Sequence, residues 1–177
     1  AVVLGYPGGG EFAATPARLQ RDLAVVRAWL GTDPTTGERH LPDAVRSSLV
    51  NNGKGLYQLH DVLSDADLFR RLRLRGQTRG PDGLDDYMRA LSLVTGPPYK
   101  QLHPGGGIWL AEDRDDQHLL VAIVDTAHLA VTMALQIPDL KMARLAAEVA
   151  ATAAPHEQSP KADLAAVAQA EGDTGRA

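Results

Sequence analysis

Residues 127–155 read AHLAVTMALQIPDLKMARLAAEVAATAAP, and this stretch decides the fold. It consists of two arms rich in Ala and Leu, joined by a short turn at residues 137–139. Ala and Leu lose little conformational freedom in a helix, whereas strands favour β-branched and aromatic residues. Because the turn is short, the two arms are expected to lie antiparallel. The stretch therefore predicts a helical hairpin.

Small residues mark the faces through which the two arms are expected to pack. On the second arm, Ala143 and Ala150 lie two helical turns apart, and Pro155 ends the helix. The matching small residues of the first arm are Ala127, Ala130 and Ala134. This pattern resembles the tetratricopeptide repeat, in which each unit is a pair of antiparallel helices. An ordinary alanine-rich hairpin is the simpler alternative.

The same helical spacing extends in both directions from the hairpin. Apolar residues recur three and four positions apart, as on one face of an amphipathic helix. The expected helices cover residues 16–31, 65–76, 82–94, 108–136, 138–154 and 157–170. A Gly-Pro-Pro sequence at residues 96–98 is expected to stop the third helix.

The N-terminal part has a different organisation. A short strand is expected at residues 2–6, and Asn52-Gly53 predicts the turn of a hairpin within residues 48–59. We therefore divide the chain into an N-terminal segment at 1–64, a helical domain at 65–172 and a tail at 173–177. The predicted class is mainly α: an antiparallel helical array preceded by a small α/β segment.

Composition and charge restrict the functions that the chain can have. There is no cysteine, which excludes disulfides and thiolate metal sites. Residues 81–177 carry seven basic and fourteen acidic side chains, whereas residues 1–64 carry six of each. An acidic surface repels phosphate, so any contact with DNA is expected from the N-terminal segment. No apolar run approaches the roughly 20 residues that span a bilayer, and we expect this part of the protein to be cytoplasmic.

Several features in order resemble one family of helical domains. They are the sequence DADLF at residues 65–69, the sequence ALSLVTGPPY at residues 90–99, Trp109-Leu110 and the alanine-rich pairs that follow. Together they resemble the bacterial transcriptional activator domain, which is tetratricopeptide-like, over residues 65–172. The resemblance implies a regulatory domain that binds a protein partner or self-associates, without catalysis. The same domain occurs in large membrane-associated proteins with LysM modules, and a scaffold of that kind is the alternative.

In actinobacterial antibiotic regulators this domain follows a winged helix. Residues 16–31 resemble the recognition helix of a winged helix, and residues 51–60 resemble its β-wing, although the first half of that fold is missing or degenerate. The resemblance implies possible DNA contact through Arg18, Gln20, Arg21, Arg27 and Lys54. The alternative is that these are solvated charges on an amphipathic helix and a turn.

No catalytic or cofactor motif accompanies these patterns. The chain lacks a His-Glu-x-x-His zinc sequence, a Gly-x-Ser-x-Gly nucleophile turn and a phosphate-binding loop. We therefore expect no enzyme activity, no cofactor and no metal. Trp29 and Trp109 are expected to anchor the core. The five arginines at residues 70–79 are expected either to pair with the acidic helices or to dock DNA or an acidic partner.

Overall fold

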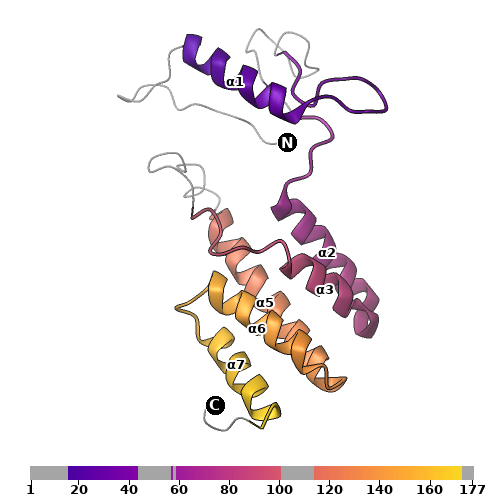
Figure 1. Ribbon diagram of the computed structural model, residues 1–177, viewed down its shortest axis with the longest axis vertical. Coiled ribbons are helices and arrows are strands. Elements are labelled where there is room, and N and C mark those ends of the chain that lie inside the picture. The colour runs from indigo at the N-terminus through magenta and orange to yellow at the C-terminus, as the bar shows by residue number, and fades with distance from the viewer. Residues whose placement is uncertain (1–15, 44–56, 58, 101–113, 173–177) are drawn as a thin grey trace. The chain divides into compact units, whose positions relative to one another are not determined.

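The computed structural model describes residues 16–43, 57, 59–100 and 114–172. Those residues are mainly helical, as predicted, and their one strand-like pairing is an isolated antiparallel bridge between Thr32 and Arg39. The helical elements are α1 (Pro16–Leu30), α2 (Asp65–Arg79), the 3₁₀ helix η2 (Gly80–Gly83), α3 (Leu84–Leu91), α5 (Asp115–Gln136), α6 (Leu140–Ala153) and α7 (Gln158–Ala170) (Figure 1).

The chain divides into two compact units, Ala1–Leu63 and Ser64–Ala177. The predicted boundary between residues 64 and 65 lies next to this division. Ser64 groups with the second unit because its side chain caps α2. Its hydroxyl oxygen accepts the Asp67 backbone N–H at 3.1 Å and donates to the Asp67 carboxylate at 2.8 Å.

In the first unit, a loop folds back along α1. Leu23 of the helix and Leu41 of the loop are buried. Arg27 joins the two, since its Nε donates to the Leu41 carbonyl at 2.7 Å and its guanidinium lies 3.1 Å from the Asp43 carboxylate. Gly31, at a φ of 72°, provides the left-handed turn after the helix.

The prediction that Trp29 anchors the core is wrong, because its side chain is 83% exposed. It lies one helical turn after Val25, which is 65% exposed, on the side of α1 away from Leu23. Trp109, Lys54, the strand predicted at residues 2–6 and the turn at residues 51–53 lie outside the described residues. In the second half of the hairpin predicted within residues 48–59, Tyr57 and Leu59 are described, and neither is in a strand.

The second unit begins with α2, which touches the following 3₁₀ helix η2 backbone to backbone. A Cβ placed on Gly83 would lie 2.1 Å from the Gly76 carbonyl oxygen, and one on Gly76 would lie 2.7 Å from the Tyr87 ring. Only two glycines allow this approach. The contact also corrects the helix predicted over residues 82–94, because the chain makes the turn η2 first and α3 ends at Leu91.

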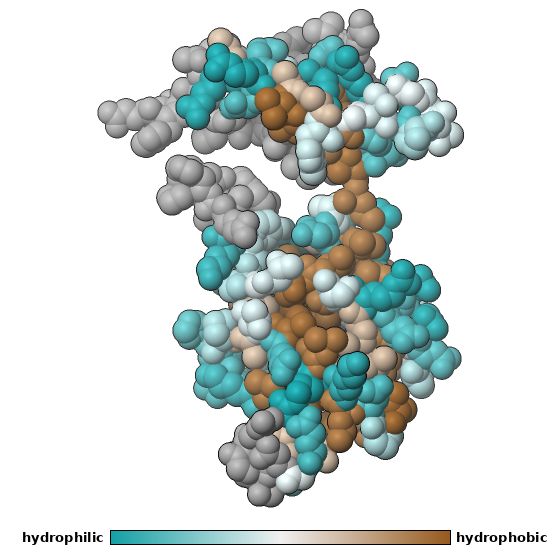
Figure 2. Space-filling model, in the orientation of Figure 1, coloured by the Kyte–Doolittle hydropathy of each residue, from teal (hydrophilic) through white to brown (hydrophobic). Residues whose placement is uncertain are grey.

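A hairpin of α5 and α6 forms the centre of the second unit. The turn between them ends at Asp139, whose side chain accepts the Met142 backbone N–H at 2.9 Å and so caps α6. α7 packs against both helices, and α3 packs against α5 on the other side (Figure 1). Figure 2 shows apolar surface in the middle of this unit, where α3, α5 and α6 meet, with polar surface on both flanks.

α5 starts later than the predicted helix at residues 108–136. Its first residue is Asp115, preceded by Arg114 in the left-handed region at a φ of 50°. Among the described residues, α5 alone is long and apolar enough to cross a membrane by length and composition. Core helices of folded domains pass the same test, and 33% of the apolar stretch of α5 is buried.

Candidate functional site

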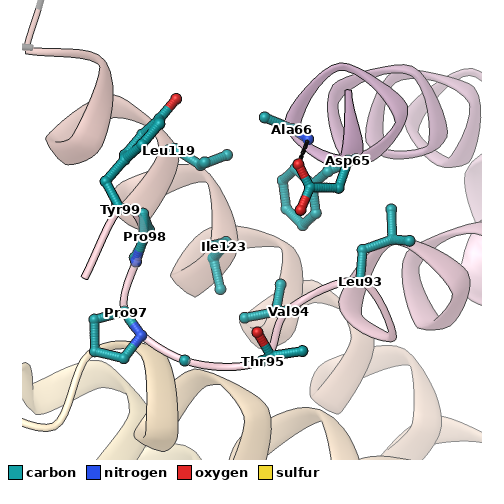
Figure 3. A pocket seen from close by; sticks show the side chains of 12 residues that line it. Asp65, Ala66, Leu93, Val94, Thr95, Pro97, Pro98, Tyr99, Leu119 and Ile123 are labelled. Carbon is teal, nitrogen blue, oxygen red and sulfur yellow. Dashed lines mark hydrogen bonds between the residues drawn. The ribbon is translucent and has the colours of Figure 1, made fainter. Parts of the chain in front are cut away.

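The second unit contains a cavity of about 190 Å³ at one end of its helices. The start of α2 forms one wall with Asp65, Ala66 and Phe69, and the segment at residues 93–99 forms another. Leu119 and Ile123 of α5 complete the lining. In Figure 3, Tyr99 and Leu119 lie on one side and Asp65 and Ala66 on the other, with Ile123 between them.

A polar network fixes one edge of this cavity. Tyr99 donates its hydroxyl to Asp115 Oδ2 at 2.7 Å, and Arg70 donates to Asp115 Oδ1 at 2.5 Å. Burial raises the pKa of the Tyr99 hydroxyl to about 12, and the neighbouring Asp115 carboxylate contributes to the increase. Tyr99 is therefore a neutral hydrogen-bond donor over the physiological range, and it links the segment at residues 93–99 to the start of α5.

Asp65 gives the opposite edge its charge. Its Oδ1 accepts the Ala66 backbone N–H at 2.9 Å, and its side chain is exposed. Within the described residues Asp65 pairs with no cation, whereas Asp67 and Asp115 both contact Arg70. The exposed carboxylate of Asp65 also contributes to the raised pKa of Tyr99 across the cavity.

The arginines of α2 pair mostly with acidic side chains of the same unit. Arg70 contacts Asp115 and Arg73 lies 3.6 Å from Asp125, so both bridge α2 to α5. Arg75 and Arg79 converge on Asp86 of α3, at 3.3 and 2.8 Å. Asp86 is only 1% exposed, so the two guanidinium groups neutralise a buried carboxylate. Arg71 is exposed, with no acidic partner among the described residues.

A histidine and an aspartate join α5 to α7. His128 Nδ1 lies 2.8 Å from Asp163 Oδ1, and Asp163 is only 5% exposed. Asp125, which lies three residues before His128 on the same helix, contacts Arg73 instead. Within the described part of the chain, no cluster of three or more His, Asp or Glu side chains could hold a metal ion.

The residues predicted to contact DNA lie in different settings. Arg18, Gln20 and Arg21 are exposed in the first half of α1, where Arg18 lies 3.9 Å from Asp22. Arg27 is occupied by Leu41 and Asp43, and its side chain is only 16% exposed. Lys54 lies outside the described residues.

Of the residues predicted to pack the hairpin, the alanines of α5 and α6 are buried and the proline is not. Five alanines are completely buried: Ala127, Ala130, Ala134, Ala143 and Ala150. Pro155 is exposed and follows Ala154, the residue that caps the end of α6.

Sequence reasoning missed the cavity itself. Residues 96–98 are expected to stop a helix and residues 90–99 contribute to the family resemblance, but residues 93–99 also form a wall of the cavity. The usable signal was Tyr99, a large side chain directly after two prolines and before the next helix. Comparison of the chain with protein-family models, with curated proteins and with solved structures found no match.

Proposed function

We propose that the second unit is a non-catalytic protein-interaction domain of a transcription-regulator-like protein, built on the tetratricopeptide-like plan of the bacterial transcriptional activator domain. The observation that carries this proposal is the open cavity formed by α2, the segment at residues 93–99 and α5. Its walls are mainly apolar and come from three separate segments, which is typical of a preformed binding site. The packing of α7 against both α5 and α6 supports a continuing array of helices.

A peptide-display selection tests this proposal directly. The immobilised full chain is expected to enrich peptides from a random library, and the enriched peptides should compete with one another for a single site. Ala66→Phe, which fills the cavity from its wall, is expected to abolish their binding. Ala162→Phe is the matched control because Ala162 is exposed on α7, away from the cavity. A selection that enriches no competing peptides would falsify the proposal.

Contact with DNA through the first unit is a second candidate function. Arg18, Gln20 and Arg21 are exposed together near the start of α1, where a recognition helix presents its side chains. Binding of the chain to a mixed-sequence DNA duplex should weaken steeply as salt increases. Replacing Arg18 and Arg21 by Ala together should weaken that binding, and binding unchanged by both replacements removes this candidate.

The alternative is a scaffold from a larger LysM-type membrane-associated protein that binds no DNA. The sequence of the whole protein distinguishes the two. An intact winged helix beside this chain supports the regulator, whereas membrane spans and LysM modules support the scaffold. In both cases the second unit binds a protein, so the selection experiment applies unchanged.

A further inference from the structure

We infer that the cavity binds one aromatic side chain of a partner protein that carries an arginine or lysine next to it. The inference rests on the proposed interaction function and specifies the chemistry of the partner. Three properties of the cavity lead to it: its size, the apolar and aromatic character of its walls, and the negative charge of Asp65 at its edge.

The size of the cavity matches a single ring. It measures about 190 Å³, and an apolar cavity of about 150 Å³ is sufficient to hold benzene. A second side chain of similar size does not fit beside the first. The cavity therefore accommodates one anchoring side chain from the partner.

The walls favour an aromatic ring over an aliphatic chain. Phe69, which is 2% exposed, and Tyr99 both line the cavity, and aromatic pairs gain stability from edge-to-face or offset contacts beyond simple burial. Ile123 and Val94 supply further apolar surface. The Tyr99 ring is held in place by its hydrogen bond to Asp115, so this surface is formed before any partner arrives.

The charge at the edge favours a cation beside the ring. Asp65 is exposed on the cavity wall and faces no cation among the described residues. The nearest arginine, Arg70, is already engaged by Asp67 and Asp115. The excess of acidic side chains over residues 81–177 adds to the preference for a basic partner. A partner with an acidic residue beside its aromatic anchor meets repulsion at the same position.

The test uses two capped peptides that differ at one residue, Ala-Phe-Arg-Ala and Ala-Phe-Glu-Ala, titrated into the full chain and followed by NMR. The arginine peptide is expected to shift the backbone signals of Thr95, Leu119 and Ile123 saturably. Its dissociation constant should be about threefold lower than that of the glutamate peptide, as expected for one exposed ion pair. Equal affinity of the two peptides, or shifts located away from the cavity, overturns the inference.

Two pairs of variants test separately whether the cavity binds the aromatic ring and whether the Asp65 carboxylate attracts the neighbouring cation. Ala66→Phe should abolish binding of the arginine peptide, whereas Ala162→Phe should leave it unchanged. Asp65→Asn should remove the difference between the two peptides, whereas Asp85→Asn, which removes an exposed charge on α3, should preserve it. Persistence of the difference in Asp65→Asn, or binding by Ala66→Phe, contradicts the inference.

Two further outcomes distinguish this inference from related proposals. If benzene shifts the cavity signals while neither peptide does, the site holds a small free ring and the inference is overturned. If the display selection enriches peptides that lack an aromatic residue next to a basic one, the interaction function stands and only the partner chemistry is wrong. Enrichment of that pair of residues supports both.

Discussion

Asp86 is a buried carboxylate whose charge is neutralised by two arginines. It is 1% exposed, and Arg79 and Arg75 lie 2.8 and 3.3 Å from its Oδ2. The two arginines remain partly in water, with side-chain exposures of 40% and 58%, so the cost of desolvation falls mainly on the carboxylate. From the sequence these arginines are expected either to pair with the acidic helices or to dock DNA or an acidic partner, and helical spacing does not identify the buried acid that Arg75 and Arg79 share.

Removing Arg79 tests the role of that pair. Arg79→Ala should lower the free energy of unfolding by about 1–3 kcal/mol, because a buried carboxylate loses its shortest contact. The control is Arg71→Ala on the same helix, whose change should stay within about 0.5 kcal/mol. Urea denaturation followed by circular dichroism measures both. Similar losses in the two variants would show that the Asp86 contact contributes nothing specific.

Tyr99 provides a pH-dependent signal from the cavity. Burial and the Asp115 carboxylate raise its pKa from 10.0 to about 12. Because the folded state disfavours the phenolate, the stability from neutral Tyr99 is complete below pH 10 and is lost as pH rises towards about 12. Ultraviolet absorbance should show a tyrosine that titrates near 12 in the wild-type chain and is missing in Tyr99→Phe. Asp115→Asn should lower this pKa only in part, since burial is the larger cause.

At the scale of single elements, periodicity predicted where the helices lie but not how they begin and end. Apolar spacing is a property of one helix, so α2, α6 and α7 fall close to their expected ranges. The helix expected over residues 82–94 is shorter because Gly83 must touch Gly76, a contact between elements that no local pattern encodes. The cavity was missed for the same reason, since it arises where three segments meet.

The close contact of α2 with η2 predicts that alanine at Gly83 and alanine at Gly76 lower the free energy of unfolding by different amounts. Gly83→Ala should cost about 3 kcal/mol, because the new Cβ meets the backbone oxygen of Gly76, which has little room to move. Gly76→Ala should cost less, since its nearest obstacle is the Tyr87 side chain and alanine favours the helix. Thermal unfolding of the two variants measures the order. Equal or reversed costs would mean that the two segments separate to accept a methyl group.

At the scale of the whole molecule, the second unit has a complete core of its own. Among the described residues, the buried cluster runs from Phe69 to Val167 and contains no residue of the first unit. The sequence predicts an N-terminal segment at residues 1–64, a helical domain at residues 65–172 and a tail at residues 173–177. It does not predict the environment of α1, where Trp29 is expected to anchor the core but its side chain is exposed.

This division predicts that the second unit folds alone. A fragment covering residues 64–177 should keep its helical circular dichroism and unfold at the same temperature as that unit does in the full chain. The reason is that its core cluster loses no member on removal of residues 1–63. The fragment starting at residue 66, which lacks the Ser64 cap, is the comparison and should be less stable by about 1 kcal/mol. A disordered 64–177 fragment contradicts the division.

The five buried alanines of α5 and α6, at residues 127, 130, 134, 143 and 150, form what we call the alanine seam. This seam has a further consequence for how the hairpin folds. Alanine has no rotatable side-chain torsion, so its burial removes no rotamer entropy, whereas a buried leucine or methionine loses part of its rotational freedom. The five methyl groups of this seam therefore reach their final positions as soon as the two backbones do. These five positions therefore add no side-chain rearrangement of their own once the two helices have met.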